Sequence, residues 1–193
     1  MELRVLGCLI EKQRTTPDVY PLSLNALRLA CNQATNRDPV VEYDEPTIRE
    51  ALQRLSRRGW VRLASGSGSR AAKYRHLANE ALNLSHAELS LLAVLMLRGA
   101  QTPGELKQRT ERLHHFESPA ELEGVLEGLI QRELVARLPR RPGQKEQRYT
   151  QLLGSEEEDA PQLPSFEAGG SLEARVERLE AEVRELREAL DRS

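Results

Sequence analysis

An internal repeat is the feature that most restricts the fold of this chain. The segments "ELRVLGCLIEKQRTTP" (2–17) and "ELSLLAVLMLRGAQTP" (88–103) share an opening Glu-Leu, apolar residues at helical spacing and a closing Thr-Pro, at a constant offset of 86. The segments "TIREALQRLSRRGWV" (47–61) and "ELEGVLEGLIQRELV" (121–135) match at an offset of 74. Such self-similarity predicts one supersecondary unit that occurs twice.

Capping residues predict where the helices of the second copy begin. Ser85, Thr102 and Ser118 each have a glutamate three positions later, which is the spacing of a capping box. Proline follows two of these three residues directly, and proline favours the first helical position. We therefore expect three capping boxes and three helices in the second copy.

Similar signals recur in the first copy. Ser23 is expected to cap "LNALRLACNQ", and the next helix is expected to start around Pro46, after Asp44 or Glu45. "WVRLA" and "AAKYRHL" then alternate around a Gly/Ser turn, which predicts a β-hairpin. The first copy also holds twelve more residues than the second, since the two offsets differ by that number, and they lie between Pro17 and Pro46.

Each copy thus has the predicted order helix, helix, helix, strand, turn, strand, which is the order of a winged helix. The expected fold class is mainly α with small β-hairpins (α+β), arranged as two tandem winged-helix domains plus a C-terminal coiled-coil-like helix. The expected boundaries are 1–78 for the first winged-helix domain, 79–153 for the second, 154–170 for an acidic flexible linker and 171–193 for an amphipathic helix.

One long block of the first copy carries a family resemblance. "LGCLIEKQRTTPDVYPLSLNALRLACNQATNRDPVVEYDE" (6–45) resembles the signature block of the YceH-like family of uncharacterised bacterial proteins. The resemblance covers roughly residues 1–153. It implies tandem winged-helix domains and a cytoplasmic bacterial setting, and it supplies no catalytic or binding residues.

Charge is distributed unevenly along the chain, although the formal net charge is only −2. Residues 1–78 hold 13 Lys/Arg and 8 Asp/Glu, residues 79–153 hold 10 of each, and residues 154–193 hold 5 and 12. The first segment therefore carries +5 and the last −7. A polyanionic partner is expected to prefer the first segment and to be repelled by the tail.

The helix that starts near Pro46 is the predicted DNA-reading element. Ile48, Ala51, Leu52 and Leu55 form its apolar stripe, which leaves the basic residues facing outward. Arginine and glutamine can hydrogen-bond base edges, whereas cations near the helix end and in the wing suit phosphate. The predicted contacts to double-stranded DNA are Arg49, Gln53, Arg54, Arg57, Arg58, Arg70, Lys73 and Arg75.

Two other interpretations of this helix remain open. A solvated arginine-rich face occurs on many helices, because basic residues near a C-terminus also favour the helix dipole. In addition, tandem winged helices serve as protein-interaction adaptors that need not touch DNA. Glu121, Glu123 and Glu127 in the third helix of the second copy favour the adaptor, since they would repel phosphate.

A polar block in the first copy is a second candidate site. It predicts either an ordered loop rich in local backbone bonds or a pocket for a ligand or protein partner. The residues of the expected pocket are Glu11, Lys12, Tyr20, Asn25, Asn32 and Arg37.

No enzymatic motif is present, so we expect a non-enzymatic protein without cofactor or metal. The four histidines lack cysteine or carboxylate partners at metal-ligand spacing, and no nucleophile elbow or phosphate loop occurs. Cys8 and Cys31 sit among apolar neighbours and are expected to be buried, inert thiols. No signal peptide or membrane span is apparent, and a cytoplasmic location is expected.

The end of the chain has the pattern of a short coiled coil. Apolar residues alternate spacings of four and three, with β-branched valine at two a positions and leucine at d, which favours a parallel homodimer. The alternative is an amphipathic helix that packs on its own chain. The seam comprises Leu172, Val176, Leu179, Val183, Leu186 and Leu190.

Overall fold

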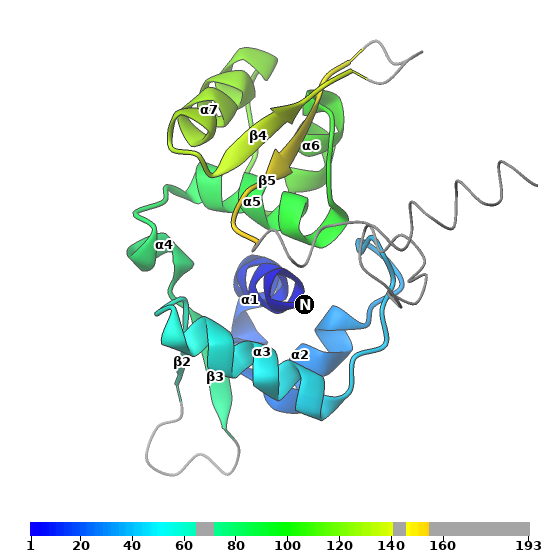
Figure 1. The fold of residues 1–193 in the computed structure, drawn as a ribbon, viewed down its shortest axis with the longest axis vertical. Coiled ribbons are helices and arrows are strands. Elements are labelled where there is room, and N and C mark those ends of the chain that lie inside the picture. The colour runs from blue at the N-terminus through cyan, green and yellow to red at the C-terminus, as the bar shows by residue number, and fades with distance from the viewer. Residues whose placement is uncertain (65–71, 141–145, 155–193) are drawn as a thin grey trace, which may run out of the picture. The chain divides into compact units, whose positions relative to one another are not determined.

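The computed structural model describes residues 1–64, 72–140 and 146–154 (Figure 1). The heptad helix, nearly all of the predicted linker and Arg70 lie outside the described residues, and those predictions are not tested by it. The described part combines α-helices with small antiparallel sheets, which confirms the α+β class. None of its helices is long and apolar enough to cross a membrane.

The first half of the described chain follows the predicted order with two additions, a 3-10 helix and a short strand before the second helix. Its elements are α1 (Glu2–Thr15), the 3-10 helix η1 (Pro17–Val19), β1 (Leu22–Ser23), α2 (Leu24–Cys31), α3 (Glu45–Arg57), β2 (Val61–Leu63) and β3 (Lys73–His76). The Ser23 hydroxyl accepts from the Ala26 amide and the Asp44 carboxylate from the Thr47 amide, so both helices have their predicted caps. The three strands are antiparallel in the order β1-β3-β2.

The second half has three longer helices and a hairpin in the same order, and a short helix precedes them. Its elements are α4 (Ala78–Ala81), α5 (His86–Arg98), α6 (Pro103–Thr110), α7 (Pro119–Gln131), β4 (Val135–Leu138) and β5 (Arg148–Gln151), the last two forming an antiparallel hairpin. Capping boxes open α5 at Ser85 and α6 at Thr102, which confirms two of the three predicted.

The third predicted capping box is wrong in one of its two bonds. The Ser118 hydroxyl accepts from the Glu121 amide, but the Glu121 carboxylate accepts from the Glu117 amide at 2.8 Å instead of from the Ser118 amide. Ser118 has a φ of −135°, whereas Ser85 and Thr102 have −67° and −78°. The more extended backbone turns the Ser118 amide away, because φ sets the direction of the N–H.

The two halves are equivalent in their contacts as well as in their order. Arg58 Nη1 lies 3.5 Å from Glu2 in the first half, and Arg132 Nη1 lies 3.0 Å from Glu88 in the second. These pairs are related by the offsets of 74 and 86. Gly59 and Glu133, also 74 apart, both take a left-handed φ, of 73° and 55°, directly after the helix. The sequence repeat therefore marks a structural repeat.

The extra residues of the first half fall on both sides of α2. The N-caps of α2 and α6, Ser23 and Thr102, are 79 residues apart. Of the twelve extra residues, seven therefore precede α2, where η1 and β1 lie, and five lengthen the loop between α2 and α3. That loop begins with Asn32, whose amide nitrogen donates to the Tyr43 carbonyl at 2.8 Å and whose oxygen accepts from the Tyr43 amide at 2.9 Å.

Helix α1 is the centre of the buried core. It packs against α2 and α3 on one side and against α5 on the other (Figure 1). At the α1–α5 crossing, a Cβ placed on Gly7 would lie 2.9 Å from Leu97 Cγ, so the helices approach as closely as a side-chain-free residue allows. Cys8 and Cys31 are free and buried in this core, as predicted. The apolar core thus runs continuously from the first half into the second.

Candidate nucleic-acid interface

Helix α3 presents the predicted division between an apolar and a polar face. Ile48, Ala51, Leu52 and Leu55 are buried against the core, whereas Gln53 and the basic residues are exposed. The stripe forms because residues three and four apart lie on one face of a helix. The outward face of α3 is therefore accessible to a partner.

Two of the predicted DNA contacts on α3 are engaged in intramolecular pairs. Arg54 contacts Glu50 at 2.5 Å and Glu2 at 3.5 Å, and the hydrogen bond to Glu50 raises the pKa of its guanidinium. Arg58 contacts the other oxygen of Glu2 at 3.5 Å and lies over the Trp60 ring at 5.3 Å. Because the Glu2 side chain is only 7% exposed, these bonds fasten the end of α3 to the start of α1.

The other cations near α3 have exposed acidic neighbours or none. Arg49 lies 4.0 Å from Glu45, with both side chains about half exposed, and such pairs contribute little. Arg75 on β3 contacts Glu80 at 3.2 Å. The Arg57 side chain is exposed and makes no ion pair or hydrogen bond within the described part of the chain.

A cleft of about 270 Å³ separates α3 from the β2–β3 hairpin. The charged residues among those that line it are Arg49 and Arg62, and no acid is among them; the full lining is Arg49, Leu52, Gln53, Ser56, Val61, Arg62, Leu63 and Tyr74. Arg62, which the predicted set omits, is exposed on β2 and lies directly opposite Arg75. Like charges opposite one another destabilise a sheet, and an anion laid along the hairpin would relieve that repulsion. The alternation of buried Val61 with Arg62 was the sequence signal for its exposure.

Lys73 completes the described part of the predicted wing. It lies opposite Ser23 in the pairing of β1 with β3, two residues before Arg75 and therefore on the same face of the strand. The hairpin thus carries three cations on one face, Arg62, Lys73 and Arg75.

In the second half, an ion pair joins the third helix to the hairpin at the corresponding position. Glu127 occupies the position of Gln53 at the offset of 74, and its carboxylate contacts Arg137 of β4 at 3.1 Å. Arg137 in turn corresponds to Leu63 of β2. Together with Glu121 and Glu123, this makes the outward side of α7 acidic, as the sequence predicted. The two halves share a fold and differ in the charge beside the third helix.

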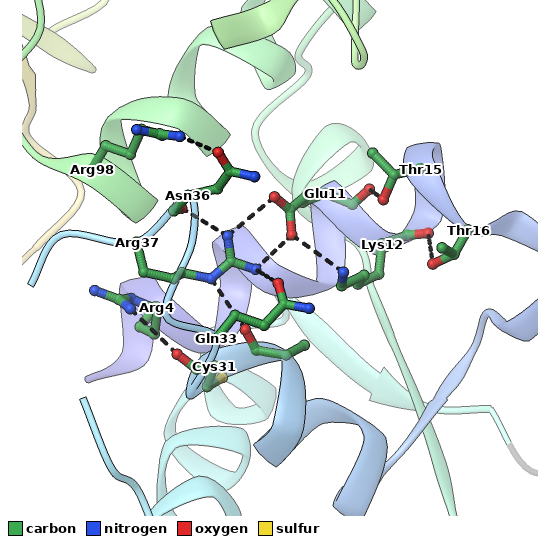
Figure 2. A network of polar contacts seen from close by, with 11 residues as sticks. Arg4, Glu11, Lys12, Thr15, Thr16, Cys31, Gln33, Asn36, Arg37 and Arg98 are labelled. Carbon is green, nitrogen blue, oxygen red and sulfur yellow. Dashed lines mark hydrogen bonds and ion pairs between the residues drawn. The ribbon is translucent and has the colours of Figure 1, made fainter. Parts of the chain in front are cut away.

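The predicted pocket residues divide into a network and separate contacts. Glu11, Lys12 and Arg37 come together around α1 (Figure 2). The Arg37 side chain is fully buried and donates to both Glu11 oxygens, at 3.1 and 2.5 Å, and to the Ala30 carbonyl at 3.1 Å. Burial lowers the pKa of Arg37, but the hydrogen bonds to Glu11 more than offset this and leave the pKa raised.

The other three predicted pocket residues make separate hydrogen bonds elsewhere in the first half. The Tyr20 hydroxyl accepts from the His76 amide at 2.8 Å, joining the segment after η1 to β3. Asn32 bonds the backbone of Tyr43, and Asn25 accepts from Arg28 at 3.1 Å on the surface of α2. The structure therefore does not gather all six residues into one pocket.

The chain is thus an α+β protein built from two copies of a helix–helix–helix–hairpin unit, in which the cleft of the first copy is cationic. Comparison with known protein families identifies the family of the chain. Residues 1–144 match the family described as Protein of unknown function, DUF480, and the chain belongs to this family. The match covers all elements of the first copy and those of the second copy as far as β4, and it ends before β5.

Proposed function

We propose that this chain is a non-enzymatic protein of the YceH-like type, with tandem winged helices, that binds double-stranded DNA through α3 and the β2–β3 hairpin. The observation that carries the proposal is the cleft beside α3, which is lined by two arginines and by no acid. A winged helix places its third helix in the major groove and its hairpin against the backbone. The order of the elements and the net charge of the first segment support the same assignment.

The contacts divide the α3 cations into two roles. Arg54 and Arg58 contact Glu2 and so hold the C-terminal end of α3 against the start of α1. Arg57 and Arg62 are exposed and unpaired among the described residues, and they are proposed to meet phosphates. Arg49 and Gln53 line the cleft and are proposed to face base edges.

The proposal predicts that replacing Arg57 and Arg62 with alanine in the full chain weakens duplex binding on all sequences. Affinity at low salt should fall roughly tenfold or more, because each arginine forms a charge-assisted hydrogen bond to phosphate. The slope of log K against log salt should fall by about 0.9 for each phosphate that the variant no longer neutralises. Fluorescence anisotropy with a random duplex across a salt series measures both quantities.

A matched control removes two cations from the second half. The variant Lys107→Ala with Arg137→Ala changes the net charge equally but leaves α3 and its hairpin intact. It should keep the affinity and the slope of the unaltered chain. An equal loss of affinity in both variants, or no salt-dependent binding by the unaltered chain, would sink the proposal.

The alternative function is a protein-interaction adaptor. The acidic outward side of α7 favours it, together with exposed apolar side chains on the first half such as Leu29 and Val40, which are 56% and 58% exposed. Absence of duplex binding by the full chain at low salt would leave this function as the better supported one.

The heptad seam at 171–193, outside the described residues, leads us to propose a parallel homodimer. Two copies would give a DNA-binding protein two half-site readers. Analytical ultracentrifugation should show a dimer for the full chain and a monomer for a chain that ends at Gly170. Because a coil of this length is near the lower limit of stability, the measurement needs a concentration of roughly 10–50 µM. A full-length chain that stays monomeric there would remove the seam as a dimer element.

A further inference from the structure

A second cationic site lies away from α3, where α1 meets α5 and α6. It is a cavity of about 310 Å³ whose charged lining consists of Glu11, Arg98, Arg109 and Arg112. Glu11 belongs to the first half and the three arginines to the second. Because none of these residues contributes to the cleft beside α3, the two sites are distinct.

The single acid of this cavity does not neutralise its arginines. Both Glu11 oxygens accept hydrogen bonds from the buried Arg37 side chain, and Lys12 lies 3.8 Å from one of them (Figure 2). Arg98 donates to the Asn36 side chain, which carries no charge. The charge of Arg109 is offset in part by Glu105 in the first turn of α6, 3.3 Å away.

Arg112 is the third arginine of the cavity and adds to its net positive charge. Within the described residues it makes no ion pair or hydrogen bond, although it lines the cavity. Burial lowers the pKa of Arg98, and the nearby guanidinium groups of Arg109 and Arg37 lower it further. Glu11 and Asp38 oppose this effect in part. Arg98 and Arg109 are therefore close enough to repel each other, and an anion between them would relieve this repulsion.

We propose that this cavity binds a small phosphate-bearing molecule with a charge near −2. Guanidinium groups bind phosphate through paired N–H donors, and three of them line this cavity, where the one lining carboxylate is already bound by Arg37 and Arg109 alone has a close acidic partner. The volume exceeds that of one phosphate group, which leaves room for a second phosphate or a small organic part. The ligand would touch α1 of the first half and α5 and α6 of the second, and so would tie the halves together.

Isothermal titration of the full chain with pyrophosphate and with inorganic phosphate, at constant ionic strength in chloride, tests the proposal. The unaltered chain should bind pyrophosphate, and Arg112→Ala should lower that affinity roughly tenfold or more, the value of one charge-assisted hydrogen bond. Arg112 is exposed, so the variant should unfold at the same temperature as the unaltered chain.

Lys107→Ala is the control, on α6, the helix that directly precedes Arg112. The Lys107 ammonium donates to the Glu117 carbonyl at 3.3 Å and does not line the cavity, so pyrophosphate affinity should be unchanged. Equal reductions in the two variants, or no binding of either phosphate by the unaltered chain at millimolar concentration, would overturn the proposal. A reduced duplex affinity in Arg112→Ala with an unchanged pyrophosphate affinity would also overturn it, by assigning Arg112 to the nucleic-acid interface.

Discussion

Replacing Arg37 with methionine should lower the free energy of unfolding by about 3–5 kcal/mol, the range for a buried ion pair that loses one partner. The side chain is fully buried, and its nitrogens satisfy both Glu11 oxygens and the Ala30 carbonyl. Methionine fills a similar length but donates no hydrogen bond. Glu11 would then remain partly buried, with only the more distant Lys12 ammonium, at 3.8 Å, as a cationic neighbour. Urea denaturation followed by circular dichroism measures the change in stability.

Two further variants separate the ion pair from a general effect of losing an arginine. Arg28→Met removes a cation whose hydrogen bond to Asn25 is exposed, and it should change stability by no more than about 0.5 kcal/mol. Adding Glu11→Gln to Arg37→Met should recover part of the stability, because the uncompensated charge is removed. A cost for Arg37→Met no greater than that for Arg28→Met would contradict the assignment.

Local signals were sufficient to predict the three longer helices and the hairpin of each copy, but not η1, β1 or α4. Helix starts at Ser23, Asp44, Ser85 and Thr102 follow from side chains that bond amides within one turn, and such bonds depend on nearby sequence alone. The second bond of the box at Ser118 depends on a backbone angle that the sequence pattern does not contain. The prediction of a complete capping box at Ser118 therefore failed, because the same residue types permit two backbone conformations there.

The roles of the arginines needed the three-dimensional structure. Glu2 lies more than fifty residues from Arg54 and Arg58 along the chain, and no periodicity links them. Their counterpart in the second half, Arg132 with Glu88, shows that an arginine after the third helix is a structural element of both copies. Counting basic residues on α3 therefore overstates the number available to DNA.

The cationic cavity was missed for a related reason. Its arginines come from α5, from the last turn of α6 and from the turn that follows α6, and the packing of these helices around α1 brings them beside Glu11. In the sequence, Arg109 and Arg112 belong to an ordinary mixed-charge helix with Glu105 and Glu111 nearby. The site depends on which of these arginines form ion pairs with acidic residues. Tertiary contacts determine that pairing, and the sequence pattern does not contain them.

Replacing Gly7 with valine should lower the free energy of unfolding by about 3 kcal/mol, at the upper end of the range for overpacked cores. A Cβ at this position would lie 2.9 Å from Leu97 Cγ and 3.3 Å from Met96 Cβ, and valine adds two further methyl groups. Leu97 is 3% exposed, so its side chain has no solvent-filled space to enter. The result would show that the contact of α1 with α5 holds the two halves together.

Gly128→Val is the matched control, because Gly128 also lies within a helix but a Cβ there would meet nothing within 4 Å. Valine favours a helix more than glycine does, so this variant should be unchanged or slightly more stable. Leu97→Ala alone should cost about 2–5 kcal/mol, but in its background Gly7→Val should cost less than in the unaltered chain, since the cavity receives the added methyl groups. Thermal and urea unfolding of the four variants provides the cycle. Equal effects of valine at positions 7 and 128, or strict additivity with Leu97→Ala, would show that the close approach of α1 and α5 does not limit the size of residue 7.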